Sequence, residues 1–259
     1  MSEALLNIVA VQLDIAWEQP RENLVRVEAL LARADVPPGS LIVLPEMFAT
    51  GFSMQVERTA QDQSRSTEAY LRHLARKHRS VVLGGVVGPL QGATATNEAV
   101  AIDASGQQLV RYCKMQPFTI SGEQHRYPAG QRHQLFQWRG VCVAPFICYD
   151  LRFPEVFRPA ARDGAELFVV IANWPAVRSE HWVRLLQARA IENQAYVVGV
   201  NRCGSAPELT YDGRSVAFDP LGVCLIEAGD REQVLAIEID VPRLRAWREK
   251  FPALADMRR

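Results

Sequence analysis

The stretch Gly140-Val-Cys-Val-Ala-Pro-Phe-Ile-Cys-Tyr-Asp-Leu-Arg-Phe-Pro-Glu155 contains a strand, a turn and the start of a helix. Val141 to Ile147 is almost entirely apolar, which is typical of a strand buried on both faces of a sheet. Pro154 and Glu155 suit the first turn of a helix, because proline lacks the N–H that would be unpaired there and an acid favours the helix dipole. Cys148 therefore lies where a buried strand ends and a short turn begins.

The position of Cys148 favours a chemical role for its thiol. A thiol at a strand end lies beside free backbone N–H groups, which is the arrangement of a cysteine nucleophile with an oxyanion hole. The alternative is inert packing, because free cysteines usually behave as small buried hydrophobic residues. The polar residues that follow Cys148 favour the first interpretation, and we assign the second to the other cysteines, Cys113, Cys142, Cys203 and Cys224.

Composition excludes several classes of protein. Hydrophobic residues make up 48% and charged residues 22% of the 259, as in ordinary globular enzymes. The 29 basic and 29 acidic residues cancel, so no broad electric field favours nucleic acid or a membrane surface. Five cysteines without CxxC pairs indicate a reducing compartment and no structural zinc. We see no signal peptide and no membrane-spanning run, and we expect a cytoplasmic protein without metal or cofactor.

Apolar runs alternate with helical patterns along the chain, which predicts a single α/β domain over residues 1–259 with a C-terminal tail from about 251. We expect Ser66 or Thr67 to cap one of the helices, because their hydroxyls accept hydrogen bonds from free N–H groups. Gly84, Gly85 and Gly88 are expected to break the strand that covers residues 80–87.

Three polar residues come directly after apolar strands. Glu46, Lys114 and Cys148 have this position in common, and strand ends of α/β sheets converge on one pocket. Considered one at a time, Glu46 is compatible with a capping or turn carboxylate, and Lys114 with a lysine at a sheet edge whose amine extends into solvent. Together they form a base, an oxyanion-binding cation and a nucleophile. The chain lacks HExxH, GxGxxG and GxxxxGK[ST] motifs, so no metal or phosphate motif competes.

The same segments resemble a known family. Leu44-Pro-Glu-Met-Phe48, Tyr112-Cys-Lys114 and Ile147 to Glu155 are similar, in family order, to three motif blocks of the nitrilase (carbon–nitrogen hydrolase) superfamily. Asn173-Trp-Pro175 and Gln187 to Ala195 resemble two further blocks. The resemblance implies a four-layer α-β-β-α sandwich. It also implies a homodimer in which helices around the nucleophile strand meet.

The resemblance further implies a catalytic triad of Glu46, Lys114 and Cys148, with a second active-site glutamate that we place at Glu123. Pro45 to Met54 and Ala172 to Arg178 look like the branch of bacterial ω-amidases (2-oxoglutaramate amidases), which release ammonia from 2-oxo dicarboxylic acid monoamides. Many relatives have histidine where this chain has Gln116, a difference that bears on substrate preference.

A small 2-oxo acid amide, with water as the second reactant, needs further binding groups. We expect the Tyr149 N–H to bind the oxyanion, and Arg178 or Arg202 to bind a carboxylate, although each is also compatible with a surface ion pair. The aromatic candidates for the pocket wall, any of which can instead be plain core packing, are Phe48, Phe118, Tyr149 and Trp174.

Three alternatives remain open at this level. The same triad serves nitrilases, carbamoylases and aliphatic amidases, so the substrate is not fixed by it. A non-catalytic binding module derived from a hydrolase is the second alternative. The third is a cysteine hydrolase that uses one of the five histidines as its base.

Overall fold

Residues 5–258, the part of the chain that the computed structural model describes, form two six-stranded sheets that pack face to face. The first sheet has the order β14 (Gln233–Ile239), β1 (Leu6–Gln12), β2 (Leu41–Val43), β3 (Val81–Val87), β4 (Asn97–Ile102), β5 (Gln108–Cys113). The second has the order β13 (Cys224–Glu227), β12 (Val216–Phe218), β9 (Tyr196–Asn201), β8 (Leu167–Ala172), β7 (Val141–Ile147), β6 (Phe136–Trp138).

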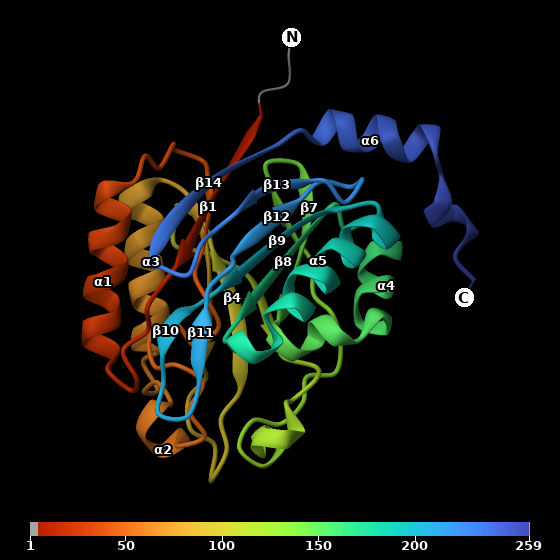
Figure 1. Ribbon diagram of the computed structural model, residues 1–259. Helices are drawn as coiled ribbons and strands as arrows, with labels where there is room; N and C mark the ends of the chain where they lie inside the picture. The colour runs from red at the N-terminus through yellow and green to blue at the C-terminus, as the bar shows by residue number, and fades with distance from the viewer. Residues whose placement is uncertain (1–4, 259) are drawn as a thin grey trace.

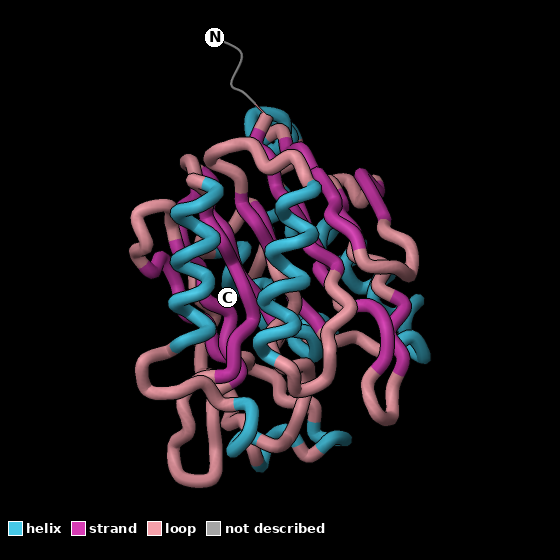
Figure 2. The backbone as a smooth tube through the Cα atoms, turned by 90° about the vertical axis from the view of Figure 1, so that its left-hand side faces the viewer, coloured by secondary structure: helices cyan, strands magenta, loops and turns pink. Residues whose placement is uncertain are grey.

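Helices cover the outer faces of both sheets. The helices are α1 (Pro20–Arg33), α2 (Val56–Thr59), α3 (Ser66–His78), α4 (Pro154–Arg162), α5 (Ser179–Asn193) and α6 (Val241–Lys250). In Figure 1, α1 and α3 lie outside the first sheet, and α4 and α5 outside the second. Figure 2, seen from the side of α1 and α3, shows both helices over the strands. The predicted α/β fold with four layers, α-β-β-α, is confirmed.

Two apolar cores hold these layers together. One core lies between the first sheet and its helices, where Val27, Leu31, Leu71 and Leu74 pack against β1 to β4. The larger core joins the inner faces of both sheets and continues under α4 and α5. Every residue of β8 is buried, which explains why its sequence is a continuous apolar run rather than an alternating one.

Parallel pairing in the middle of each sheet places several strand ends at one edge. β2 is parallel to β1 and β3, and β8 is parallel to β7 and β9. The segments that leave β2, β7, β8 and β9 at their carboxyl ends therefore start from the same end of the sandwich. A separate hairpin, β10 (Cys203–Ser205) with β11 (Thr210–Asp212), also extends to this end (Figure 1).

Two local predictions were wrong. β3 runs without interruption through Gly84 and Gly85, because the missing side chains make room for neighbouring segments instead of breaking the strand. The residue that precedes α3 is Arg65, in a left-handed conformation and without a side-chain cap, and Ser66 already belongs to the helix. The Ser66 N–H is bound by Asp62 Oδ1 at 3.2 Å, so an upstream acid replaces the predicted hydroxyl.

The C-terminal part crosses the top of the molecule in Figure 1. α6 begins after Asp240, whose carboxylate accepts a hydrogen bond from the Arg243 N–H as a regular N-cap. Beyond α6, the described part of the tail contains one short 3₁₀ turn at Ala253–Asp256. Among the helices of residues 5–258, none has the length and apolar character that a membrane span requires.

Candidate active site

Cys148 directly follows β7 and begins a 3₁₀ turn that ends at Arg152. Its φ is +46°, in the left-handed region, where an L residue carries a cost of about 1–2 kcal/mol. Positions of this kind persist only where the surroundings hold them, and they cluster at functional sites. Cys148 Sγ lies 3.8 Å from the carbonyl oxygen of Asn173, which follows the neighbouring strand β8.

Glu46 is fully buried just beyond the end of β2. Its Oε2 accepts a hydrogen bond from the Asn173 N–H at 2.8 Å, and its backbone oxygen accepts one from Asn173 Nδ2 at 2.7 Å. Asn173 therefore contacts Glu46 through its N–H groups and the Cys148 thiol through its carbonyl oxygen. This residue joins the ends of β2, β7 and β8 at one point.

Lys114, which follows β5, lies between two buried carboxylates. Its Nζ is 3.1 Å from Glu46 Oε1, and 3.0 and 2.9 Å from the two oxygens of Glu123. Lys114 is 2% exposed and both glutamates are 0% exposed. Burial by itself lowers the pKa of Lys114, but the carboxylates of Glu46 and then Glu123 raise it above its ordinary value. The two carboxylates therefore favour the charged form of Lys114.

The thiol of Cys148 has the opposite electrostatic preference. Burial, followed by the carboxylate of Glu46, raises the pKa of this thiol well above its ordinary value, although the ammonium of Lys114 lowers it. The surroundings of Cys148 thus favour the neutral thiol over the thiolate. A nucleophilic attack by Cys148 requires a base that takes its proton as the new bond forms.

Asn97, at the start of β4, connects the two glutamates. Its Nδ2 donates to Glu46 Oε1 at 2.8 Å and to Glu123 Oε1 at 3.0 Å. Glu123 Oε2 also accepts a hydrogen bond from the Phe118 N–H at 2.6 Å. These donors offset the excess negative charge of two carboxylates around one ammonium.

A small cavity opens beside these groups. Its volume is about 40 Å³, counted as the space in which the centre of a water molecule fits. This is room for a small molecule only, because one water needs about 10–15 Å³ on that measure. The residues at its wall include Lys114, Cys148, Asn173, Phe52, Phe118, Tyr149, Trp174, Arg152, Arg178 and Tyr211.

Two arginines at this wall lie on aromatic rings. The guanidinium carbon of Arg152 is 4.8 Å from the Trp174 ring centre, and that of Arg178 is 5.4 Å from the Phe118 ring centre. Burial and the nearby Arg178 lower the pKa of Arg152. Within residues 5–258, no salt bridge joins either arginine to a carboxylate, and Arg152 instead contacts His181 Nδ1 at 3.2 Å. The wall thus has two cations available for an anionic ligand.

Comparison with protein families agrees with this geometry. The model of the carbon–nitrogen hydrolase family matches residues 7–249. The chain belongs to the carbon–nitrogen hydrolase family. It is 33% identical to the 2-oxoglutaramate amidase of Bacillus subtilis, with 97% of each chain covered. It is 37% identical to the omega-amidase YafV of Yersinia enterocolitica, over 97% of this chain and 96% of that protein.

Solved structures of other carbon–nitrogen hydrolases have the same fold. XC1258 from Xanthomonas campestris, a CN-hydrolase superfamily protein solved with an arsenic adduct in its active site, has a TM-score of 0.91 and 33% identity. The comparison covers 99% of this chain and 98% of that one. An amidase from Nesterenkonia sp. AN1, with the acetamide moiety of fluoroacetamide added covalently to its active-site cysteine, has a TM-score of 0.86 and 27% identity. Here the coverage is 98% and 94%.

In this carbon–nitrogen hydrolase, the prediction that Phe48 forms part of the pocket wall was wrong. Phe48 is fully buried in the core between the first sheet and its helices, with its ring 6.2 Å from that of Tyr70. The chain turns at Met47, whose φ is +44°, and this turn points Phe48 away from the cavity. From the same loop, Phe52 reaches the cavity instead, and its ring centre lies 5.1 Å from Lys114 Nζ.

Arg202 was also predicted wrongly as a carboxylate-binding candidate. Its side chain is fully buried, and its Nη2 donates to the carbonyl oxygens of Ile15 and Ser205, each at 2.9 Å. The guanidinium carbon lies 4.4 Å from the ring centre of Tyr211, which borders the cavity. Arg202 therefore supports the β10–β11 hairpin from inside instead of facing a ligand.

The other expected binding residues, Phe118, Tyr149, Trp174 and Arg178, do lie at the cavity wall. Sequence reasoning missed Asn97, Phe52 and Arg152. Asn97 is the first residue of β4, so it lacks the signal that identified Glu46 and Lys114, which follow their strands. Histidine does not occur among the described residues of the wall, so the alternative of a cysteine–histidine pair has no support here.

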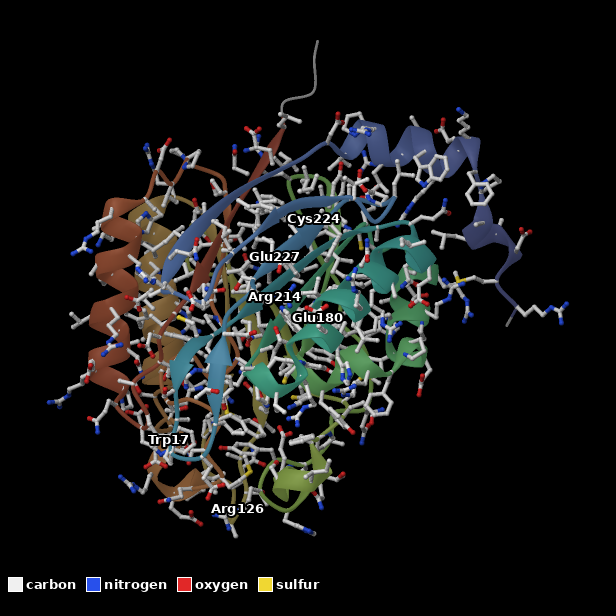
Figure 3. The ribbon with its side chains drawn as sticks, in the orientation of Figure 1. Trp17, Arg126, Glu180, Arg214, Cys224 and Glu227 are labelled. Atoms are coloured by element: carbon white, nitrogen blue, oxygen red, sulfur yellow. The ribbon has the colours of Figure 1, made fainter. Side chains whose placement is uncertain are left out.

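Contacts at the outer end hold the loops around the cavity together. Arg126 Nε donates to the carbonyl oxygen of Met54 at 3.1 Å, and its guanidinium pairs with Glu57 of α2. Figure 3 shows Arg126 at the end of the molecule where the loops gather. The segment that contains Glu123 is thereby tied to the segment that contains Phe52.

Proposed function

We propose that this protein hydrolyses the terminal amide of 2-oxo dicarboxylic acid monoamides, such as 2-oxoglutaramate, and releases ammonia. The observation that carries the proposal is the composition of one small cavity, whose wall combines the Cys148 thiol and the Lys114 ammonium with the guanidinium groups of Arg152 and Arg178. Such a substrate has an amide that reacts and a carboxylate that needs a cation. Guanidinium groups bind carboxylates with two parallel hydrogen bonds.

The relatives support the substrate class. The 2-oxoglutaramate amidase and the omega-amidase named above cover nearly the whole chain at 33% and 37% identity. The triad by itself does not distinguish this reaction from nitrile or carbamoyl hydrolysis, because each of these reactions stabilises a similar tetrahedral centre. The two arginines favour an acid amide over an uncharged nitrile.

In the proposed mechanism, Glu46 takes the thiol proton while Cys148 Sγ bonds to the amide carbon. Lys114 and the Tyr149 N–H bind the oxyanion of the tetrahedral intermediate. When the C–N bond breaks, Glu46 gives its proton to the leaving nitrogen, and ammonia departs. Glu123, which binds the Lys114 ammonium with both oxygens, keeps it oriented.

The second half of the reaction consumes water. Glu46 removes a proton from water as the hydroxyl adds to the thioester carbon. Collapse of this second intermediate breaks the C–S bond, releases the 2-oxo dicarboxylic acid, and returns the proton from Glu46 to the thiolate of Cys148. The net change is one amide and one water converted to one acid and one ammonia.

The test is a comparison of ammonia release from 2-oxoglutaramate, glutamine, asparagine, an N-carbamoyl amino acid and simple nitriles. We expect kcat/KM to be highest for 2-oxoglutaramate, and Cys148→Ala to abolish turnover. A higher kcat/KM for a nitrile or a carbamoyl compound would contradict the proposal and would make the protein a nitrilase or a carbamoylase instead. Turnover retained by Cys148→Ala would remove the thioester from the mechanism.

We also propose that the protein works as a homodimer in the cytoplasm, with the whole chain acting as one domain. Exposed apolar side chains on α5 and on the β12–β13 connection support self-association, because Ile191, Leu221 and Val223 are about half exposed, at 52%, 47% and 55%. The cysteines are all unpaired in the structure, which suits a reducing compartment. Light scattering on the eluting protein is the test, and a monomer mass at micromolar concentration would contradict the dimer.

A further inference from the structure

Asp150 is a fully buried carboxylate two residues after the candidate nucleophile, and no step of the proposed mechanism uses it. It is not among the residues at the cavity wall, so it does not reach the substrate. A buried carboxylate is costly unless its oxygens are bound by donors. The groups that donate hydrogen bonds to Asp150 therefore indicate which parts of the structure this carboxylate holds in place.

One set of contacts is to its own turn. Asp150 Oδ2 accepts a hydrogen bond at 2.9 Å from the N–H of Ile147, the last residue of β7. This bond closes over Cys148, whose left-handed backbone needs outside support. From the other side, Arg189 of α5 donates from Nη2 to the carbonyl oxygen of Leu151 at 2.8 Å. The nucleophile turn is thus held from within by Asp150 and from α5 by Arg189.

The second set of contacts is to the segment that contains Lys114. The Tyr112 hydroxyl donates to Asp150 Oδ2 at 2.7 Å, and the Gln116 N–H donates to Asp150 Oδ1 at 2.8 Å. Tyr112 lies two residues before Lys114 and Gln116 two residues after it. The Asp150 carboxylate therefore binds the segment around Lys114 at one residue before and one residue after the lysine in the sequence. The same carboxylate also binds the turn that contains Cys148.

We propose that Asp150 is a positioning residue, whose ionised carboxylate fixes the Cys148 turn relative to the Lys114 segment and so sets the geometry of nucleophile and oxyanion-binding cation. This inference rests on the proposed function, because it concerns the same site. Reacting groups need placement within a fraction of an ångström, and a shift of 1 Å costs about 100-fold in rate.

The charge state of Asp150 gives the proposal a pH dependence. Burial raises the pKa of Asp150 to about 6, although the hydrogen bond from Tyr112 lowers it. The charged and titratable groups that face it are Tyr112 and Lys114 on the β5 side, with Arg189 at the same turn from α5. Burial and Asp150 keep the pKa of Tyr112 well above its ordinary value, so the phenol remains a donor throughout.

The experiment compares the full-length protein with Asp150→Asn, Tyr112→Phe and a control, Asp103→Asn. Asp103 also binds several N–H groups with its carboxylate, but it lies at the other end of the β4–β5 hairpin from Lys114. We measure kcat and KM for ammonia release from 2-oxoglutaramate between pH 5 and pH 9, with circular dichroism to verify folding. We expect Asp103→Asn to match the unmodified protein.

For Asp150→Asn we expect kcat at pH 8 to fall about 100-fold, with KM changed less than about threefold. The ratio of wild-type to variant kcat should approach one below about pH 6, because the wild-type carboxylate is then protonated and resembles the amide. A purely structural role predicts a ratio that is the same at every pH, and that result would overturn the proposal. So would a kcat within about threefold of wild type at pH 8.

Tyr112→Phe removes one donor while it keeps the carboxylate. The acid limb of kcat should move to higher pH in this variant, because the lost hydrogen bond had lowered the pKa of Asp150. If Asp150→Asn does not fold, this shift decides the question, and an unmoved acid limb overturns the proposal.

The positioning role of Asp150 can be tested separately from the proposed substrate. If wild-type protein releases ammonia from none of the amides, the substrate proposal fails, and the positioning role is judged from alkylation of Cys148 by iodoacetamide at pH 8. We then expect Asp150→Asn to slow alkylation about tenfold, because the thiol loses its placement beside the Lys114 cation. An equal rate in variant and wild type would overturn the positioning role.

Discussion

Gly85 of β3 lies directly against the backbone of Glu46. A Cβ atom at Gly85 would come within 2.4 Å of Glu46 Cα and 2.7 Å of the Pro45 oxygen, closer than any real contact. The Phe48 N–H also donates to the Gly85 carbonyl oxygen at 3.2 Å. The absence of a side chain at Gly85 therefore allows the end of β2 to place the Glu46 carboxylate next to Lys114.

We predict that Gly85→Ala displaces Glu46 and impairs both folding and turnover. Overpacking of this kind typically destabilises a protein by about 1–3 kcal/mol, and backbone contacts cannot relax as a flexible side chain does. Urea unfolding and kcat are the measurements. The control is Gly229→Ala, because a Cβ there would meet nothing closer than 4.0 Å. Equal stability and equal kcat in the two variants would contradict the prediction.

The position of Glu46, Lys114 and Cys148 could be predicted because one physical rule covers all three. Strand ends that leave a packed α/β sheet on one side converge, and each residue follows an apolar run directly. The structure brings the Lys114 ammonium and the Glu46 carboxylate within 3.1 Å and places Lys114 and Cys148 at one cavity. Asn97 begins β4 and so falls outside this rule, and it reaches the same edge because β4 runs antiparallel to β3 and β5.

Side-chain direction beyond a strand end was not predictable in the same way. Phe48 and Phe52 both lie in the loop after Glu46, where the backbone is left-handed at Met47 and at Gly51, and only Phe52 of the two reaches the cavity. Arg202 lies between β9 and β10, where strand alternation no longer applies, so the sequence did not show that its guanidinium turns inward to the carbonyl oxygens of Ile15 and Ser205.

Removal of the Lys114 ammonium should harm stability as well as catalysis. Lys114→Met would leave Glu46 and Glu123 buried without their shared cation, and the loss of one partner of a buried pair typically costs about 3–5 kcal/mol. We expect kcat to fall at least about 100-fold, as when one oxyanion donor is lost. Kinetics with 2-oxoglutaramate and urea unfolding test this together. A variant that has normal kcat and only a raised KM would make Lys114 a substrate-binding residue instead.

The two cavity arginines should determine the preference for acid amides. We predict that Arg152→Gln and Arg178→Gln each raise KM for 2-oxoglutaramate by about 10–100-fold, because a hydrogen bond to a charged group contributes about 1.5–3 kcal/mol. An uncharged amide such as propionamide should be affected far less. Arg184→Gln, a substitution on α5 where the side chain is 72% exposed, is the matched control. Parallel losses with both substrates would mean that the arginines support the fold of the wall and do not bind a carboxylate.

The raised pKa of Asp150 also gives folding stability a pH dependence of definite sign. The pKa rises from 3.8 to about 6 in the folded protein, which therefore binds this proton more tightly than the unfolded chain does. The stabilising contribution is full below about pH 4 and is lost as pH rises through about 6, a change of about 3 kcal/mol. Urea unfolding of wild type and Asp150→Asn at several pH values isolates it, because the amide does not titrate. The stability of wild type relative to the variant should decline by about this amount between pH 4 and pH 8.

The control variant should show the opposite sign. The pKa of Asp103 is lowered in the folded protein, so the stability of wild type relative to Asp103→Asn should increase as pH rises from acid values. A difference in unfolding free energy between wild type and Asp150→Asn that stays constant from pH 4 to pH 8 would mean that Asp150 keeps its charge over this range. That result would contradict the pH dependence predicted for the positioning role.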